Sequence, residues 1–364
     1  MSSMEGKGRV VKLTGCVKNY DWGRAGKESR VARLYACNSG DTVDLEKPYA
    51  EFWMGTHDSG PSYVVEGAAG VSENGLGNSG GRERNKLTLK EWIENNPIVL
   101  GEKVVNKWGT NLPFLFKVLS VAKALSIQAH PDKDLASRLH SELPDVYKDD
   151  NHKPEMALAL TEFEALCGFI SLEARELTEK EQVVLRLEKQ YPADVGVLAA
   201  FLLNYVKLNP CEALYLGANE PHAYIYGDCV ECMATSDNVV RAGLTPKHRD
   251  VKTLCSMLTY RQGFPEILQG TAVNPHVMRY IPPFDEFEVD HCILPEQSTA
   301  EFPAIPGPSI FMVLEGEGTV TTSSNKIICE GDVFFEAANT SITVSTSAGL
   351  QLYRTGVNSR VFDE

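Results

Sequence analysis

Short stretches in which apolar and polar residues alternate make up much of this chain. They dominate from Lys103 to Phe169, from Glu212 to Tyr226 and from Phe284 to Val357, and Gly, Pro, Asn and Asp residues separate them. A period of two residues, with turn-forming residues between the runs, is typical of antiparallel strands. The pattern therefore predicts a mainly β protein.

Two stretches between these β regions predict helices. The run TEKE at residues 178–181 has the form of a capping box and predicts that a helix begins near Thr178. A second helix is predicted from Val195 to Leu208, where Asn209-Pro210 would end it. We therefore expect a helical insert between the β regions.

The last hundred residues predict a second β barrel. The runs GPSIFMVLEGEGTV and KIICEGDVFFEAANTSITV have the alternation of strands, with Gly316, Gly318 and Gly331-Asp332 at turns. No histidine follows Gly331-Asp332, so we expect this barrel to bind no metal. The segment from Glu66 to Lys86 is rich in Gly, Ser, Asn and Glu and predicts a surface loop without a function.

Composition narrows the classes of function. The 364 residues are 43% hydrophobic, which is enough for more than one core, and the longest apolar stretch is too short for the roughly 20 residues of a membrane span. Nine scattered cysteines show no disulfide spacing, so we expect a cytoplasmic protein. The net charge of -14 argues against nucleic-acid binding, and an anionic ligand would need a local cluster of Lys and Arg.

The stretch Leu125-Ser-Ile-Gln-Ala-His130 alternates strictly between apolar and polar residues. As a strand it would direct Ser126, Gln128 and His130 to one side, which in the simplest case is an exposed polar face. The preceding LPFLFKVLSV is apolar enough for a buried sheet. A row of polar side chains inside a barrel calls for a metal or a substrate.

Two further stretches place polar residues in the same way. In the run NHKPEMAL at residues 151–158, Lys153 and Glu155 share one side of a strand, which alone would be an ordinary ion pair. A strand that starts at His222 has Tyr224 and Tyr226 on the face of that histidine. Two imidazoles, one carboxylate and one amide oxygen suit Zn²⁺ or a related ion, although most single histidines are structural residues.

Five blocks carry a resemblance to a known family. They are KPYAEFWMGTH (47–57), LSIQAHPDK (125–133), NHKPEMALAL (151–160), ANEPHAYIYGDCVECMA (218–234) and SDNVVRAGLTPKHRDV (236–251). In sequence and order they resemble the signature blocks of type I phosphomannose isomerases. The resemblance implies zinc-dependent interconversion of mannose 6-phosphate and fructose 6-phosphate, which supplies mannose for GDP-mannose and glycoconjugate synthesis.

The resemblance also implies the architecture. It predicts a cupin-type jelly-roll catalytic barrel, a helical insert and a second cupin-like barrel. We assign residues 1–160 and 211–265 to the catalytic barrel, 161–210 to the insert and 266–364 to the second barrel, which lacks a metal. Between Gly168 and Tyr191 the insert is shorter than the family's helical domain, and loss of those helices is expected to expose apolar surface. A monomer is favoured.

The same blocks imply roles for individual residues. One Zn²⁺ per chain is expected at Gln128, His130, Glu155 and His222. Arg241 falls on the arginine of the family's VRAGLTPK motif and would face the developing oxyanion, because a guanidinium stays charged and offers several donors. The expected substrate contacts are Ser126, Lys117, Lys247, Tyr224 and Glu231.

Isomerisation moves a proton from C2 to C1 of the sugar and needs a base. His152 and Lys153 both adjoin the predicted ligand Glu155. A histidine titrates near neutral pH, and a lysine beside a dication has its ammonium form disfavoured, so either residue is a candidate. Lys153 is also a candidate for substrate binding.

Three alternatives stay open. A cupin dioxygenase would hold Fe²⁺ at two histidines and a carboxylate, but would leave Gln128 and the RAGLTPK run without a role. A sugar-phosphate binder or inactive isoform would follow if the shortened insert uncovers the barrel. Cys229 and Cys232 have the C-x-x-C spacing of a redox motif or of half a zinc knuckle, but no second pair accompanies them, so we expect them to be packing residues. We also expect no functional role for His248, His276 and His291.

Overall fold

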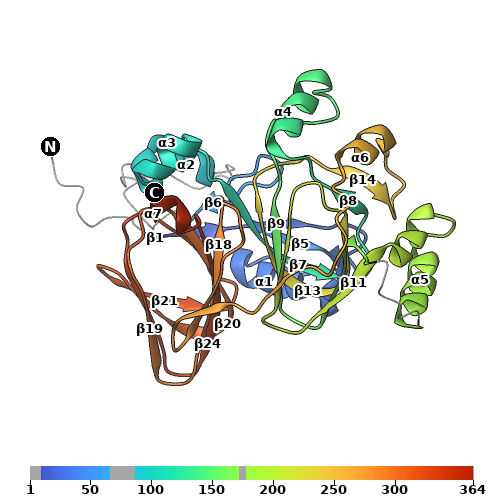
Figure 1. The fold of residues 1–364 in the computed structure, drawn as a ribbon. Helices are drawn as coiled ribbons and strands as arrows, with labels where there is room; N and C mark the ends of the chain where they lie inside the picture. The colour runs from blue at the N-terminus through green and yellow to red at the C-terminus, as the bar shows by residue number, and fades with distance from the viewer. Residues whose placement is uncertain (1–9, 66–86, 172–177, 364) are drawn as a thin grey trace, which may run out of the picture.

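The computed structural model describes residues 10–65, 87–171 and 178–363, and within them the chain is mainly β, as predicted. The predicted loop from Glu66 to Lys86 lies outside the described residues. No helix in the described ranges is long and apolar enough to cross a membrane. Figure 1 shows two bodies of curved strands side by side, with helices at their ends and on the outside.

Two sheets of eleven strands form these bodies. The strands of the first sheet are β2 (Cys16–Lys18), β5 (Glu51–Met54), β7 (Phe114–Val121), β8 (Ile127–Ala129), β9 (Glu155–Ala159), β10 (Phe163–Phe169), β11 (Leu203–Leu208), β12 (Ala213–Leu216), β13 (His222–Ala234), β14 (Val240–Gly243) and β15 (Ile267–Leu268). Its central path runs β15-β12-β9-β13-β7-β5-β2. All the strand pairs of the first sheet are antiparallel.

The second sheet contains the first and the last of the described strands. Its strands are β1 (Val10–Thr14), β6 (Tyr63–Val64), β16 (Thr271–Asn274), β17 (Val277–Tyr280), β18 (Glu288–Leu294), β19 (Ser298–Phe302), β20 (Ser309–Thr321), β21 (Asn325–Cys329), β22 (Val333–Glu336), β23 (Ile342–Thr346) and β24 (Leu350–Gly356). The short strands β3 (Arg24–Ala25) and β4 (Pro48–Tyr49) pair separately. In the described ranges the end strands of each path do not pair with each other, so the barrels are curved but not closed by hydrogen bonds.

Helices are short and lie between the strands. They are η1 (Gly26–Glu28), α1 (Arg30–Ser39), α2 (Leu89–Asn95), η2 (Pro97–Leu100), α3 (Glu102–Trp108), α4 (Lys133–Glu142), α5 (Thr178–Gln190), η3 (Val195–Phe201), α6 (Val251–Met257) and α7 (Arg360–Asp363). The helix predicted to begin near Thr178 is present as α5, which is described from Thr178 onward. Helices α3 and α4 interrupt the first predicted β region. The side chain of Asp132 caps α4 by accepting the N–H of Leu135.

The predicted helix from Val195 to Leu208 is wrong in its second half. Only residues 195–201 are helical, and 203–208 form β11, which pairs with β10. The run LNYVKL places Leu203, Val206 and Leu208 in buried positions of this strand. Long-range pairing with β10 therefore overrides the local helical preference.

Strand pairing also crosses the predicted domain boundary. β1 belongs by sequence to the first barrel, but it pairs with β22 of the second sheet, with Val11 opposite Phe335. Val11 and Leu13 are fully buried in a core that contains Phe52 and Phe116 of the first sheet as well as Phe335 of the second. Alternation in β1 predicts a strand but not its partner, which only the packing of the two sheets decides.

The two cysteines with C-x-x-C spacing are packing residues. Cys229 and Cys232 are fully buried on β13, and they belong to different core clusters. Burial raises the pKa of both thiols well above the ordinary value. The packing interpretation of this motif is therefore confirmed.

His291 in β18 is a structural residue, as predicted. Its ring is stacked on Tyr353 with centroids 4.4 Å apart, its Nε2 lies 2.7 Å from Nε2 of Gln351, and 2% of its surface is exposed. Burial lowers its pKa to about 4. The imidazole is therefore neutral in the folded protein at pH 7 and accepts the Gln351 N–H.

We expect His291 to make the protein sensitive to acid. Between pH 6.5 and about 4 the unfolded chain takes up a proton that the folded chain excludes, so the stability falls as the pH falls through this window. When the pH is lowered from 7.0 to 4.5, the unfolding free energy of both proteins falls, and the fall is expected to be about 2 kcal/mol smaller in His291→Phe than in the wild type. Urea unfolding at both pH values measures this, and equal losses would contradict it.

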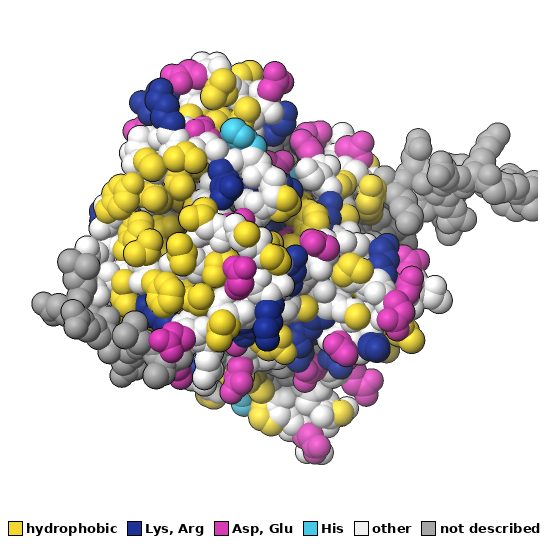
Figure 2. Space-filling view, turned by 90° about the vertical axis from the view of Figure 1, so that its right-hand side faces the viewer, with side chains coloured by type: hydrophobic (Ala, Val, Ile, Leu, Met, Phe, Trp, Pro, Cys, Tyr) yellow, Lys and Arg dark blue, Asp and Glu magenta, His cyan; other side chains and the backbone are white. Residues whose placement is uncertain are grey.

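Apolar residues are exposed on and beside the insert, as the sequence predicts. The exposed large hydrophobic residues of α5, η3 and the segment after α6 are Leu185, Val195, Leu198, Phe201, Leu202, Tyr260 and Phe264. Figure 2, a view of the side on which α5 and α6 lie, shows hydrophobic side chains gathered on this face. The insert therefore covers the first sheet while leaving apolar surface of its own in water.

Candidate metal centre and active site

Three strand ends of the first sheet meet at one place. His222 begins β13, Glu155 begins β9, and His130 follows the last residue of β8. β13 pairs with β8 through His222 and Gln128, and with β9 through Met233 and Glu155. Glu155 pairs with Met233, eleven residues along β13 from His222, so the curvature of the sheet, and not the register alone, brings together residues up to 92 positions apart.

These three residues have the geometry of a metal centre. The Nε2 atoms of His130 and His222 lie 3.4 and 3.2 Å from Oε2 of Glu155. The three side chains are at most 2% exposed, and none of these three atoms has a hydrogen-bond partner. Buried polar atoms without partners are rare, and this donor set is one that zinc prefers. In the described ranges this is the one group of its kind.

The second nitrogen of each imidazole is fixed by a backbone carbonyl. Nδ1 of His130 lies 2.6 Å from the carbonyl oxygen of Asn238, and Nδ1 of His222 lies 3.1 Å from that of Glu220. Donation from Nδ1 leaves the Nε2 lone pair directed at the centre, as in most metal-binding histidines.

The pKa values of His130 and Glu155 favour the protonation states that bind a cation. Burial lowers the pKa of His130 to about 4, so its ring is neutral at pH 7. Burial alone would raise the pKa of Glu155, but Lys153 and the imidazole of His130 hold it well below its ordinary value. The neutral imidazole of His130 and the carboxylate of Glu155 are therefore available to a divalent ion beside the imidazole of His222.

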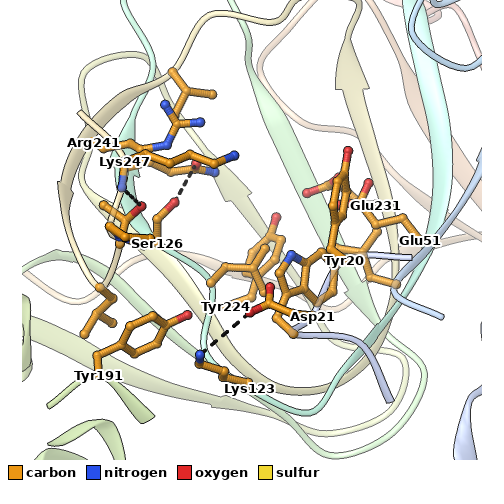
Figure 3. A pocket seen from close by; sticks show the side chains of 18 of the residues that line it. Tyr20, Asp21, Glu51, Lys123, Ser126, Tyr191, Tyr224, Glu231, Arg241 and Lys247 are labelled. Atoms are coloured by element: carbon orange, nitrogen blue, oxygen red, sulfur yellow. Dashed lines mark hydrogen bonds and ion pairs between the residues drawn. The ribbon is translucent and has the colours of Figure 1, made fainter. Parts of the chain in front are cut away.

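A cavity of about 770 Å³ opens beside this centre. Of the residues predicted from sequence, it is lined by Ser126, Gln128, Lys117, Lys153, Glu155, Tyr224, Glu231, Arg241 and Lys247. Figure 3 shows Arg241, Lys247 and Ser126 on one side of it and Glu51 and Glu231 on the other. The Oε1 atom of Gln128 lies 3.4 Å from Oγ of Ser126, and Arg241 is the register partner of Gln128 on β14.

The cations of the cavity differ in how they are paired. Lys117 is buried, with its Nζ 2.7 Å from Glu231 and 3.6 Å from Glu51, whose charges keep its pKa high although burial lowers it. Arg241 is half-buried and Lys247 exposed, and neither forms an ion pair with a described residue. Arg241 and Lys247 are therefore the cations with charge free for an anionic ligand.

His152 is not brought into the cavity. Its Nε2 lies 2.8 Å from Oε1 of Glu286, a residue just before β18 of the second sheet. Lys153, the next residue, lines the cavity with its Nζ 3.3 Å from Oε1 of Glu155, so the two neighbouring side chains lie in different surroundings. Of the two candidate bases, only Lys153 therefore lies at the cavity.

Other residues of the cavity were missed by the sequence analysis. His57 and Asp237 lie on its wall with Nε2 and Oδ1 3.3 Å apart, and Trp53 donates to Glu51. Glu51, Trp53 and His57 all fall in the block at residues 47–57 and alternate along β5 and the turn after it. That alternation was the signal that could have identified them.

Cys211 has a left-handed backbone conformation. Its φ is 71°, a left-handed value that glycine adopts without strain. It lies in the turn before β12, and its carbonyl oxygen accepts a bond from the hydroxyl of Tyr280. The turn therefore holds a non-glycine residue in a conformation that favours glycine.

Known proteins resemble the whole chain. The family model "Phosphomannose isomerase type I, catalytic domain" matches residues 10–172. Mannose-6-phosphate isomerase 2 of Arabidopsis thaliana is 50% identical over an alignment that covers 99% of this chain and 96% of the relative. The enzyme of Rattus norvegicus is 37% identical, with 92% and 95% covered. The Arabidopsis alignment has 435 positions, 71 more than the 364 residues of this chain.

Solved structures agree with this match. A phosphomannose isomerase variant from Salmonella typhimurium has a TM-score of 0.80 and 26% identity, covering 96% of this chain and 99% of that one. A zinc-bound mannose 6-phosphate isomerase has a TM-score of 0.79 and 27% identity, covering 96% and 100%. The predicted cupin-type fold is thereby confirmed. The chain belongs to the type I phosphomannose isomerase family.

Proposed function

We propose that the chain interconverts D-mannose 6-phosphate and D-fructose 6-phosphate with one bound zinc ion. The observation that carries this proposal is the set of three buried ligand atoms without partners, at the edge of a cavity with free cations. His130, Glu155 and His222 would hold the metal, and Gln128 on the same strand as the first would complete the set. When bound, zinc supplies a Lewis acid for the sugar oxygens.

Other residues of the cavity would stabilise the oxyanion and bind the sugar phosphate. Arg241 offers a permanent charge and several donors to the oxyanion that develops when the C2 proton leaves. Lys247 and Ser126, on the same side of the cavity, are suited to hold the phosphorylated sugar. Lys117 is neutralised by Glu231 and Glu51, so we assign it to fixing these carboxylates rather than to phosphate binding.

Lys153 is the better candidate for the base. It lines the cavity with its Nζ 3.3 Å from Oε1 of Glu155, whereas His152 is bonded to Glu286. Lys153→Met is expected to slow exchange of the substrate C2 proton with solvent. Unchanged exchange in a folded variant would remove Lys153 from this role.

The shortened insert is compatible with activity. The alignment with the Arabidopsis relative is 71 positions longer than this chain, which agrees with a shortened insert. Nevertheless Gln190, Tyr191 and Asp194 still line the cavity from the end of α5 onward. This favours an active enzyme over a non-catalytic binder, and a dioxygenase would leave Arg241 without a role.

A coupled assay for fructose 6-phosphate tests the function. Turnover of mannose 6-phosphate is expected in the purified protein, loss of turnover after chelation, and recovery when Zn²⁺ is restored. A folded protein without metal-dependent turnover would favour the binder instead. The cytoplasmic location, the monomeric state and the supply of mannose for GDP-mannose synthesis stay predictions.

A further inference from the structure

The segment between α5 and η3 is joined to the loop after β14 by one carboxylate. Oδ1 of Asp194 accepts the N–H groups of Gly196 at 2.7 Å and Leu244 at 3.1 Å, and Oδ2 accepts that of Thr245 at 3.1 Å. The first bond lies within the insert, and the other two cross to the loop. One side chain thus satisfies backbone donors of two segments 50 residues apart.

The two segments also meet backbone to backbone. A Cβ atom at Gly243 would lie 2.5 Å from Cα of Gly196, and one at Gly196 would lie 2.6 Å from the nitrogen of Leu244. Leu244 itself has a φ of 53°, a left-handed value that is costly for this side chain. Such a conformation persists only where surrounding contacts hold it.

Asp194 is charged in this position. Burial raises the pKa of its carboxyl, but the three N–H bonds and Arg249, at 3.8 Å, bring it below the ordinary value. Bonds to an ionised acceptor are stronger than bonds between neutral groups. The connection between insert and loop is therefore a charge-assisted one.

The loop that Asp194 holds carries Lys247 and directly follows the strand end that carries Arg241, and these are the two free cations of the cavity. Arg241 lies two residues before Gly243, and Lys247 follows Thr245, whose Oγ1 accepts the N–H of Lys247 at 3.1 Å. Figure 3 shows both cationic side chains on the same wall of the cavity. A shift of Leu244 and Thr245 would move both cations.

We propose that Asp194 is a positioning residue, whose carboxylate clamps the loop of residues 243–247 to the insert and so sets the place of Arg241 and Lys247 in the substrate cavity. The proposal rests on the proposed isomerase function. It gives the shortened insert a task in the reaction that is separate from metal binding, because Asp194 does not contact His130, Glu155 or His222.

The test compares Asp194→Ala and Asp194→Asn with Glu188→Ala. Glu188 is the matched control, because its Oε1 accepts the N–H of Ala193 within the same insert without reaching the loop. Zinc content, KM and kcat for mannose 6-phosphate, and hydrogen exchange of the Leu244 and Thr245 amides are measured. Because it displaces Lys247 and Arg241, Asp194→Ala is expected to raise KM, to lower kcat and to speed exchange of both amides, each about tenfold or more, at unchanged zinc content. Asp194→Asn retains one acceptor oxygen and is expected to be intermediate, and Glu188→Ala to match the wild type.

Unchanged KM and unchanged exchange in Asp194→Ala would overturn the proposal. If that variant fails to fold, Asp194→Asn decides by the same two measurements. Loss of zinc together with the change in KM would indicate a general structural role and would also overturn it. If the wild type has no turnover at all, the proposed function fails, while the amide exchange still reports whether Asp194 holds the loop.

Discussion

Replacing His130 by alanine is expected to abolish isomerase activity and zinc binding together. The imidazole is one of the three buried metal ligands, and the Asn238 carbonyl fixes its ring through Nδ1. In the described ranges no fourth His, Cys, Asp or Glu belongs to this group and could replace its Nε2. Loss of an outer-shell partner alone costs about 10- to 100-fold in metal affinity, and loss of a ligand should cost more. Zinc content by atomic absorption and turnover of mannose 6-phosphate measure the two effects.

Thermal unfolding gives an independent measure of the same prediction. A ligand that binds only the folded state stabilises it, so added zinc should raise the Tm of the wild-type apoprotein but not that of His130→Ala. His291→Phe is the matched control, because it removes another buried histidine that lies on β18 of the second sheet. It should keep both zinc and activity. Full zinc content in His130→Ala would exclude this histidine as a ligand.

The sequence predicted site residues correctly where they follow from the alternation of side chains along one strand. Alternation in residues 125–130 predicted Ser126 and Gln128 on one wall, and both line the cavity. The same logic applied to β5 would have added Glu51 and Trp53. Period-two patterns specify which side of a strand a residue occupies, because successive side chains must point to opposite faces.

Long-range contacts could not be predicted in this way. Nothing local in β1 says that it pairs with β22, and nothing near His152 says that Glu286, 134 residues away, takes its imidazole. The pairing of Lys117 with Glu231 also depends on the register of β7 against β13, which places these two residues opposite each other. Register follows from the packing of whole sheets, so it determines which cations are free only after folding.

The difference between the cations makes Arg241 the best test of the chemistry. Removing Lys117 would leave the buried carboxylates of Glu231 and Glu51 without their cation, which typically costs about 3–5 kcal/mol and would make a loss of activity hard to separate from a loss of folding. Arg241 is half-buried and has no acidic partner among the described residues, so its removal leaves no unpaired carboxylate. Its substitution should therefore leave the fold and the metal centre intact.

Arg241→Gln is expected to lower kcat about 100- to 1000-fold with little change in KM, as for other donors directed at a developing oxyanion. Arg241→Lys keeps the charge but loses the forked donors, so we expect it to recover only part of the rate. Lys252→Gln, an exposed change on α6, is the control for net charge. An interaction made only in the transition state lowers kcat and kcat/KM equally. A rise in KM at constant kcat would instead mean that Arg241 holds the ground-state sugar phosphate, and its assignment to the oxyanion would then be wrong.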